Sequence, residues 1–137
     1  MFRGTHDHTI DTKGRIIIPA RFREIITTRN GDQVMISALD GCLVGYPLDT
    51  WGQIEERILS QESTSELMRR FRRFFIGRAT ECTFDKQARI LVPPTLRQYA
   101  GMDRDIVLVG VLHHFEIWAR ERWDDEQQKL EADLQED

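Results

Sequence analysis

An internal repeat constrains the fold of this chain more than any other feature of its sequence. When residues 9–23 are aligned with residues 83–97, at an offset of 74, six of the fifteen positions are identical. One copy of about 60 residues could bury only about 60% of its unfolded surface and would be marginally stable alone. We therefore expect the two copies to fold into each other around a pseudo-two-fold axis.

The repeat also predicts how the chain is divided. We expect a single pseudo-symmetric domain over residues 1–137, in which residues 1–60 form the first repeat and residues 79–137 the second. Residues 61–78 are predicted to form a connecting basic helix, and the second repeat ends in an acidic helix. No Gly-, Ser- or Pro-rich linker separates the copies, which is why two independent domains are not expected.

Each repeat is predicted to be mainly β, with flanking helices. Two strands joined by a polar turn come first, and Pro19 or Pro93 stops the second of them. A short helix follows, since proline is tolerated at a helix start, and Asp40-Gly41 is a strong hairpin signal between the later strands. The predicted helices span residues 20–26 and 95–100, and the predicted later strands span residues 33–39, 42–46, 106–112 and 115–118.

Helix boundaries are indicated by capping signals. Thr50-x-x-Gln53 and Ser63-x-x-Glu66 match the pattern of capping boxes, in which two side chains satisfy the free amides of the first turn. Gly77 is a plausible end for the second of these helices. Both patterns thus predict helix starts, one at the end of the first repeat and one between the repeats.

The connecting helix is predicted to be amphipathic. Its phenylalanines are expected in a core or an interface, because an aromatic stripe at helical spacing seldom stacks on bases. Its arginines could follow a phosphate backbone, but a charged outer face or a subunit contact explains them more simply. These residues are Phe71, Phe74 and Phe75 on one side and Arg69, Arg70, Arg72 and Arg73 toward the other.

Charge is unevenly distributed along the chain, although its total is only −4. Residues 1–30 carry a net charge of +3 and residues 66–104 carry +5, while residues 31–65 and 116–137 are acidic. Of the 19 basic residues, 16 are arginine, whose planar guanidinium can bind phosphate or guanine through two hydrogen bonds. The total charge argues against a nucleic-acid partner, whereas the two positive segments argue for one.

Both repeats contain the motif Asp-x-x-x-Arg in the turn between their first two strands, as Asp11 to Arg15 and Asp85 to Arg89. Such an aspartate can accept hydrogen bonds from backbone amides a few residues on and can hold the guanidinium of the arginine. An arginine held in this way loses less entropy on meeting guanine or a phosphate. One copy would suggest an ordinary turn ion pair, but two copies in positive segments predict a DNA contact.

These two motifs, with Met1-Phe2-Arg3-Gly4 ahead of them and the arginine-rich helix between them, resemble the MraZ family of bacterial transcriptional regulators. The resemblance covers essentially the whole chain. It implies an AbrB/SpoVT-type fold, a swapped-hairpin β-barrel built here from two copies. It also implies closed ring oligomers that bind double-stranded DNA at short G-rich direct repeats in the promoter of the division and cell wall gene cluster, which includes the protein's own gene.

Carried over residue by residue, the resemblance assigns DNA contact to the two turns. Arg15 and Arg89 would bind the DNA, Asp11 and Asp85 would support them, and Lys13 and Lys86 would contact phosphates. One position departs from the family pattern, because Ala88 stands where a glycine is usual and where the first turn has Gly14. If the turn needs a positive φ, Ala88 makes it strained or changes its shape.

Parts of the sequence are also compatible with two other classes of function. The chain could be an assembly protein whose arginines serve subunit contacts within a ring. His6 and His8 could be imagined as metal ligands of a hydrolase, but no Cys or Glu cluster completes such a site. No pattern of a nucleophilic or phosphate-binding enzyme is present, so we expect neither an enzyme nor a cofactor or small-molecule substrate.

The location of the protein is expected to be cytoplasmic and nucleoid-associated. Cys42 and Cys82 stand alone rather than in a disulfide framework, which is usual in a reducing compartment. The first residues lack the apolar segment of a signal peptide, and no apolar run approaches the ~18 residues of a membrane span. We therefore expect no membrane partner.

Overall fold

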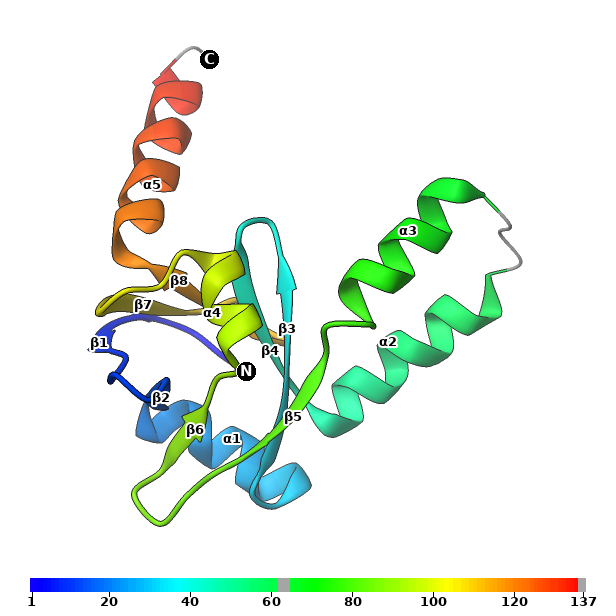
Figure 1. Cartoon of the computed structure of the whole chain (residues 1–137), viewed down its shortest axis with the longest axis horizontal. Coiled ribbons are helices and arrows are strands. Elements are labelled where there is room, and N and C mark those ends of the chain that lie inside the picture. Colours follow the sequence, from blue (N-terminus) through cyan, green and yellow to red (C-terminus); the bar gives the residue numbers. More distant parts are fainter. Residues whose placement is uncertain (62–64, 136–137) are drawn as a thin grey trace.

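Strands and helices alternate in the same order in both halves of the chain (Figure 1). The structure is a computed structural model that describes residues 1–61 and 65–135. The strands are β1 (Thr5–Thr9), β2 (Arg15–Ile17), β3 (Gln33–Leu39), β4 (Cys42–Pro47), β5 (Thr80–Thr83), β6 (Arg89–Leu91), β7 (Asp105–Gly110) and β8 (Phe115–Ala119). The helices are α1 (Ala20–Asn30), α2 (Leu48–Ser60), α3 (Glu66–Phe75), α4 (Pro94–Ala100) and α5 (Arg120–Gln135).

The two repeats exchange their first strands. β1 of the first repeat pairs with β7 of the second, and β5 of the second pairs with β3 of the first, all antiparallel. The hairpins β3–β4 and β7–β8 meet at the β4–β8 pair, so the sheet order is β1-β7-β8-β4-β3-β5. This order is unchanged when the two repeats are interchanged. Each repeat therefore completes the sheet of the other, as expected for units too small to bury a core alone.

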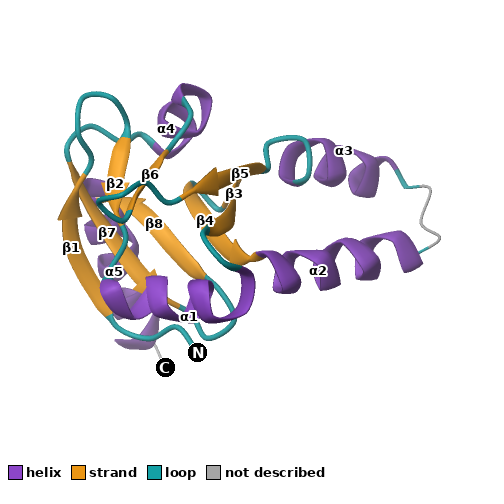
Figure 2. Ribbon diagram, turned by 90° about the horizontal axis from the view of Figure 1, so that it is seen from below, coloured by secondary structure: helices purple, strands orange, loops and turns teal. Residues whose placement is uncertain are grey.

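The second strand of each repeat forms a separate two-stranded ribbon, in which β2 pairs with β6 (Figure 2). The predicted closed barrel is not found among the described residues, because the ribbon and the six-stranded sheet are distinct. Both ribbon strands are only three residues long and are soon followed by Pro19 or Pro93, which have no N–H to extend a ladder. The architecture is a mixed α and β fold with antiparallel sheets.

The hydrophobic core lies between the ribbon, the sheet and the short helices. Equivalent residues of the two repeats occupy it in pairs, which is the packing counterpart of the sequence repeat. Ile16 and Ile90 of the ribbon are both fully buried, and Phe22 of α1 and Leu96 of α4 are each 1% exposed. Burial of each such side chain is worth about 2 kcal/mol, so the exchanged halves stabilise each other.

Three helices start directly after a proline, and none of the three has a side-chain cap. The prolines are Pro19 before α1, Pro47 before α2 and Pro93 before α4. The predicted capping box at Thr50 and Gln53 is wrong, since Pro47 starts the helix earlier and Thr50 lies inside its first turn. The fixed φ of proline, rather than a capping hydroxyl, sets these boundaries.

The helix between the repeats starts slightly later than predicted. Ser63 lies outside the described residues, and the cap of α3 is Ser65, whose hydroxyl accepts a hydrogen bond from the backbone N–H of Met68 at 3.1 Å. The helix ends at Phe75, and the N–H of Gly77 then closes the last turn. Gly77 therefore follows the helix end, as predicted.

Two other segments differ from their predictions by more than one residue. α1 continues to Asn30, four residues beyond the predicted end, and stops before Gly31 at φ +76°. β7 ends at Gly110 rather than at Leu112, because Leu112 adopts a left-handed conformation with φ +69°. The backbone of Leu112 pairs with Phe2 instead, which anchors the start of the chain.

Helices α2 and α3 lie antiparallel and project from the body as an arm (Figures 1 and 2). An aromatic cluster holds the base of the arm, where Trp51 and Phe75 have ring centroids 5.1 Å apart and both pack near Tyr46. Phe71 stacks on Phe75 at 5.3 Å, and Phe74 packs edge-on against Tyr99. The prediction that these phenylalanines are packing residues is confirmed.

The last helix, α5, leaves the body on the side away from the arm (Figure 1). It packs against β7 and β8, and near its start Trp123 contacts Trp118 at a centroid distance of 6.0 Å. None of the described α5 residues is fully buried. No helix within the described residues is long and apolar enough to cross a membrane.

Candidate nucleic-acid interface

The first Asp-x-x-x-Arg motif forms a closed turn between β1 and β2. One carboxylate oxygen of Asp11 accepts hydrogen bonds from the backbone N–H of Lys13 at 3.0 Å and of Arg15 at 2.8 Å. The other oxygen accepts from Nε of Arg15 at 2.6 Å. Backbone bonds between Asp11 and Arg15 and between Gly14 and Asp11 close the loop. The predicted hydrogen bonding of the aspartate to the guanidinium of its arginine is confirmed.

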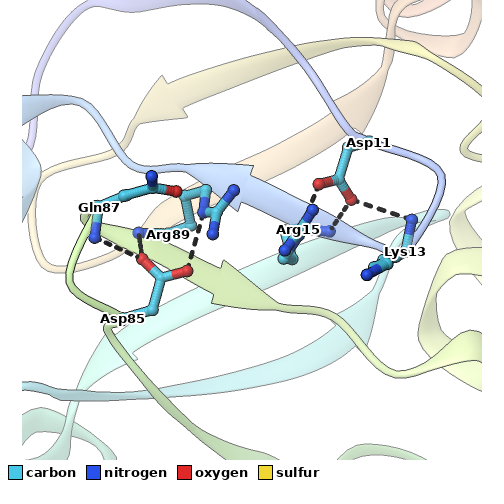
Figure 3. A network of polar contacts seen from close by, with 6 residues as sticks. All are labelled: Asp11, Lys13, Arg15, Asp85, Gln87 and Arg89. Carbon is cyan, nitrogen blue, oxygen red and sulfur yellow. Dashed lines mark hydrogen bonds and ion pairs between the residues drawn. The ribbon is translucent and has the colours of Figure 1, made fainter.

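The second motif repeats this geometry almost atom for atom (Figure 3). Asp85 accepts from the backbone N–H of Gln87 at 2.8 Å and of Arg89 at 2.9 Å, and its other oxygen accepts from Nε of Arg89 at 2.8 Å. The residue that matches Lys13 is therefore Gln87, and Lys86 lies one position earlier. Both lysines are exposed, so each adds a solvent-accessible positive charge beside its turn.

Each guanidinium is held at one nitrogen only. The carboxylate uses Nε, and the two terminal nitrogens of Arg15 and of Arg89 have no acceptor among the described residues. The side chains of Arg15 and Arg89 are 33% and 23% exposed. Each turn therefore presents an oriented pair of N–H₂ groups to solvent, which is the fork that binds guanine or phosphate through two hydrogen bonds.

The hydrogen bonds also hold the aspartates in their charged form. The backbone N–H of Arg15 is the main cause that lowers the pKa of Asp11, followed by the Arg15 side chain. The backbone N–H of Arg89 likewise lowers the pKa of Asp85. Both carboxylates are thus ionised at neutral pH and can orient the arginines.

The fourth residue of each turn has a positive φ, +91° at Gly14 and +64° at Ala88. The hydrogen bonds of the two turns match, so Ala88 leaves the shape of its turn intact and carries the strain of a left-handed residue with a Cβ. Gly14 has a second reason to be glycine: a Cβ there would lie 2.7 Å from Nε of Arg97 and 2.9 Å from the carbonyl oxygen of Val92.

The ribbon brings the two arginines onto one face. Its register sets Arg15 directly opposite Leu91 and Ile17 directly opposite Arg89. Cross-strand partners point to the same side of a sheet, and Ile17 and Leu91 are 50% and 58% exposed although they are aliphatic. Sequence reasoning missed these two residues, since strand alternation alone does not give the register between β2 and β6.

The other candidate groups do not form a site. No group of three or more His, Cys, Asp or Glu side chains that could hold a metal ion occurs within residues 1–61 and 65–135. His6 and His8 lie on the half-buried side of β1, and the ring of His6 packs edge-on against Phe22 at 5.2 Å. Burial raises the pKa of the Cys82 thiol to about 11, which keeps it protonated at neutral pH.

The fold and the turns together define a class of protein: a duplicated chain whose repeats exchange strands and present two matched Asp–Arg turns on one ribbon. The sequence profile of the MraZ protein family matches the chain twice, over residues 1–74 and 75–137. The chain belongs to this family and contains two copies of its repeat.

Close relatives cover nearly the whole chain. A protein of Desulforapulum autotrophicum is 56% identical over 135 residues, which are 98% of this chain and 91% of the relative. Proteins of Desulfosudis oleivorans and Limosilactobacillus fermentum are 50% and 46% identical and cover 98% of this chain and 90% and 92% of their own. All three bear the name "Transcriptional regulator MraZ".

Proposed function

We propose that this chain is a sequence-specific DNA-binding transcriptional regulator that controls the division and cell wall gene cluster from short G-rich direct repeats in its own promoter. One observation carries the proposal: two guanidinium groups, each oriented by an aspartate at Nε, present their free N–H₂ groups on one ribbon. The names of the relatives support the regulatory role. We propose a cytoplasmic, nucleoid-associated location and no enzymatic activity or cofactor.

The ribbon of β2 and β6 is the proposed reading element. A two-stranded antiparallel ribbon fits the major groove, where guanine offers O6 and N7 to an arginine fork. Arg15 and Arg89 would read guanines, while Asp11 and Asp85 keep the forks aligned. Lys13 and Lys86 would contact phosphates and contribute affinity that is independent of sequence.

Affinity is proposed to come from a closed homo-oligomeric ring. One chain offers few phosphate contacts and has a net charge of −4, so its binding to a single site would be weak. Several copies that meet tandem sites raise the effective concentration of each further contact. We also propose that the strand exchange between repeats is the swapped-hairpin arrangement of the AbrB type.

A titration with the DNA upstream of the protein's own gene tests the proposal. The purified protein should retard this fragment far more strongly than a fragment of equal length and composition with the direct repeats scrambled. Affinity should fall steeply between two salt concentrations, because phosphate contacts release counterions. Equal binding to both fragments would contradict sequence-specific regulation.

Light scattering distinguishes our proposal from the rival assignment. In the rival assignment the chain is an assembly protein whose arginines serve subunit contacts. In our proposal Arg15→Ala leaves the mass of the particle unchanged and weakens DNA binding. If that variant falls apart into single chains, the arginine holds subunits together and the rival assignment is favoured.

A further inference from the structure

Helix α5 carries a stripe of residues whose outer half is left uncovered by the described part of the chain. Trp123, Gln127, Leu130 and Leu134 recur at helical spacing and so lie on one face. The stripe starts on the body, where Trp123 packs on Trp118. Beyond the body it continues uncovered, since Leu130 and Leu134 are 51% and 64% exposed.

The surroundings of this stripe are acidic. From Asp124 to Gln135 the helix has five acidic residues and one basic residue. Contact of these exposed leucines with water is unfavourable, and acidic side chains surround them. Such a surface is suited to bind an apolar groove whose edges carry positive charge.

A groove of this kind lies between the helices of the arm. It has a volume of about 540 Å³, and its lining is largely apolar, with Ile58 and Leu59 of α2 and Ile76 after α3. Leu59 is 77% exposed. Arg72 and Arg73 of α3, with Glu55 of α2 and Gly77, complete the lining, so the groove combines aliphatic contact with two arginines and one carboxylate.

The guanidinium of Arg72 at this groove has one N–H group without a hydrogen-bond acceptor among the described residues. One of its terminal nitrogens donates to the carbonyl oxygen of Ile58 at 2.9 Å. Its Nε is buried and has no acceptor among the described residues. A buried guanidinium N–H without an acceptor is costly, so the fold holds Arg72 at the groove against a local penalty.

We propose that this groove binds the outer half of α5 from a second copy of the chain. Leu130 and Leu134 would enter between Ile58 and Leu59 of α2 on one side and Ile76 on the other, and the acidic side chains of α5 would face Arg72 and Arg73. The proposal rests on the ring assembly of the proposed function and names its interface.

The position of the two elements makes the contact one between copies. The arm packs against β3 and β4, whereas α5 packs against β7 and β8 and points away from the arm (Figure 1). Charge also favours this pairing: two α5 helices are both acidic and repel each other, whereas α3 presents Arg72 and Arg73 at the groove. Arm to α5 is a head-to-tail contact, which closes a ring when the rotation between copies closes.

Cysteine cross-linking tests the contact directly. The native thiols of Cys42 and Cys82 are buried and give little background. Under mild oxidation, a chain with Leu59→Cys and Leu134→Cys should form a ladder of disulfide-linked oligomers. The matched control replaces Leu59→Cys by Leu67→Cys, since Leu67 is an equally exposed arm residue, at 76%, that does not line the groove. Equal ladders in both chains, or none in either, would overturn the proposal.

The mass of the assembly provides a second readout. Leu134→Glu and Arg73→Glu should each reduce the particle to small species in light scattering, while Leu67→Glu should leave it intact. All three positions are exposed, so far-ultraviolet circular dichroism should be unchanged. A wild-type protein that is a single chain in solution, or a full-size Leu134→Glu particle, would overturn the proposal.

A DNA-binding measurement distinguishes failure of this interface from failure of the proposed function. The dissociated Leu134→Glu chain should still bind a fragment with one direct repeat as the wild type does and should lose only the avidity for tandem repeats. If the chain dissociates and single-repeat binding is also absent in the wild type, the interface stands and the proposed function fails.

Discussion

Arg15 lies directly opposite Leu91 on the ribbon, and the pseudo-symmetric pair is Arg89 opposite Ile17. The candidate DNA-reading face therefore alternates a charged fork with an exposed aliphatic side chain. Ile16 and Ile90, the residues between them, are fully buried. The inner residues of the ribbon hold it on the core, and the outer four are available to a ligand.

Leu91→Ser is expected to weaken specific DNA binding by about fivefold, the loss of a small apolar contact such as that with a thymine methyl. The slope of affinity against salt should not change, because leucine releases no counterions. Fluorescence anisotropy at several salt concentrations measures both quantities. Val111→Ser, at another exposed aliphatic residue, is the control, and an equal effect of both variants would argue against the contact.

Asp11→Asn is expected to weaken specific DNA binding by about fivefold, although it removes a negative charge. The side chain that orients Arg15 loses its ion pair, so the arginine must be ordered on binding. Asp7→Asn is the matched control, since Asp7 forms an exposed ion pair with Arg120. If electrostatics alone mattered, both variants would bind DNA more tightly, and tighter binding by Asp11→Asn would count against the orienting role.

The substitutions Gly14→Ala and Ala88→Gly should change the free energy of unfolding in opposite directions. Gly14→Ala is expected to lower the free energy of unfolding by about 2 kcal/mol or more, because φ is positive and the new Cβ meets Arg97 and Val92. Ala88→Gly is expected to raise it by up to about 1 kcal/mol, because it relieves a left-handed alanine. Urea unfolding at one protein concentration measures both, and a stabilised Gly14→Ala protein would contradict the turn geometry.

The two turn aspartates should titrate below the usual ~3.9 of an aspartic acid. Hydrogen bonds from the arginine backbone and side chain lower both pKa values, so their stabilisation is fully present above the unfolded-state pKa. It is lost as pH falls through the lowered native pKa. Carbon-13 NMR of the carboxyl groups follows the midpoints. In Arg15→Ala the Asp11 midpoint should rise, and an unchanged or higher-than-usual midpoint in the wild type would contradict the bonding.

Much of this site could be predicted from the sequence because its geometry is local. Asp11 and Arg15 are four residues apart in one turn, so their contact follows from turn chemistry, and the repeat implies the same for Asp85 and Arg89. The strain at Ala88 was also foreseeable, because glycine stands at the matching position of the first turn. Local hydrogen bonding needs no knowledge of the rest of the fold.

Features that depend on distant pairing were not predictable in this way. The exposure of Ile17 and Leu91 follows from how β2 meets β6, which lie more than seventy residues apart. The predicted capping box at Thr50 was wrong because Pro47 starts the helix earlier. The uncovered stripe on α5 and the groove of the arm come from separate ends of the fold, and neither alone indicates a contact.

The affinity of Arg15→Ala and Arg89→Ala for the upstream DNA tests the central claim most directly. Each should bind specific DNA at least tenfold more weakly and lose much of the preference over scrambled DNA. Arg29→Ala, from the exposed Arg29–Asp49 pair, should bind as the wild type does. If both turn variants keep the affinity, salt slope and sequence preference of the wild type, the two Asp–Arg turns do not read DNA.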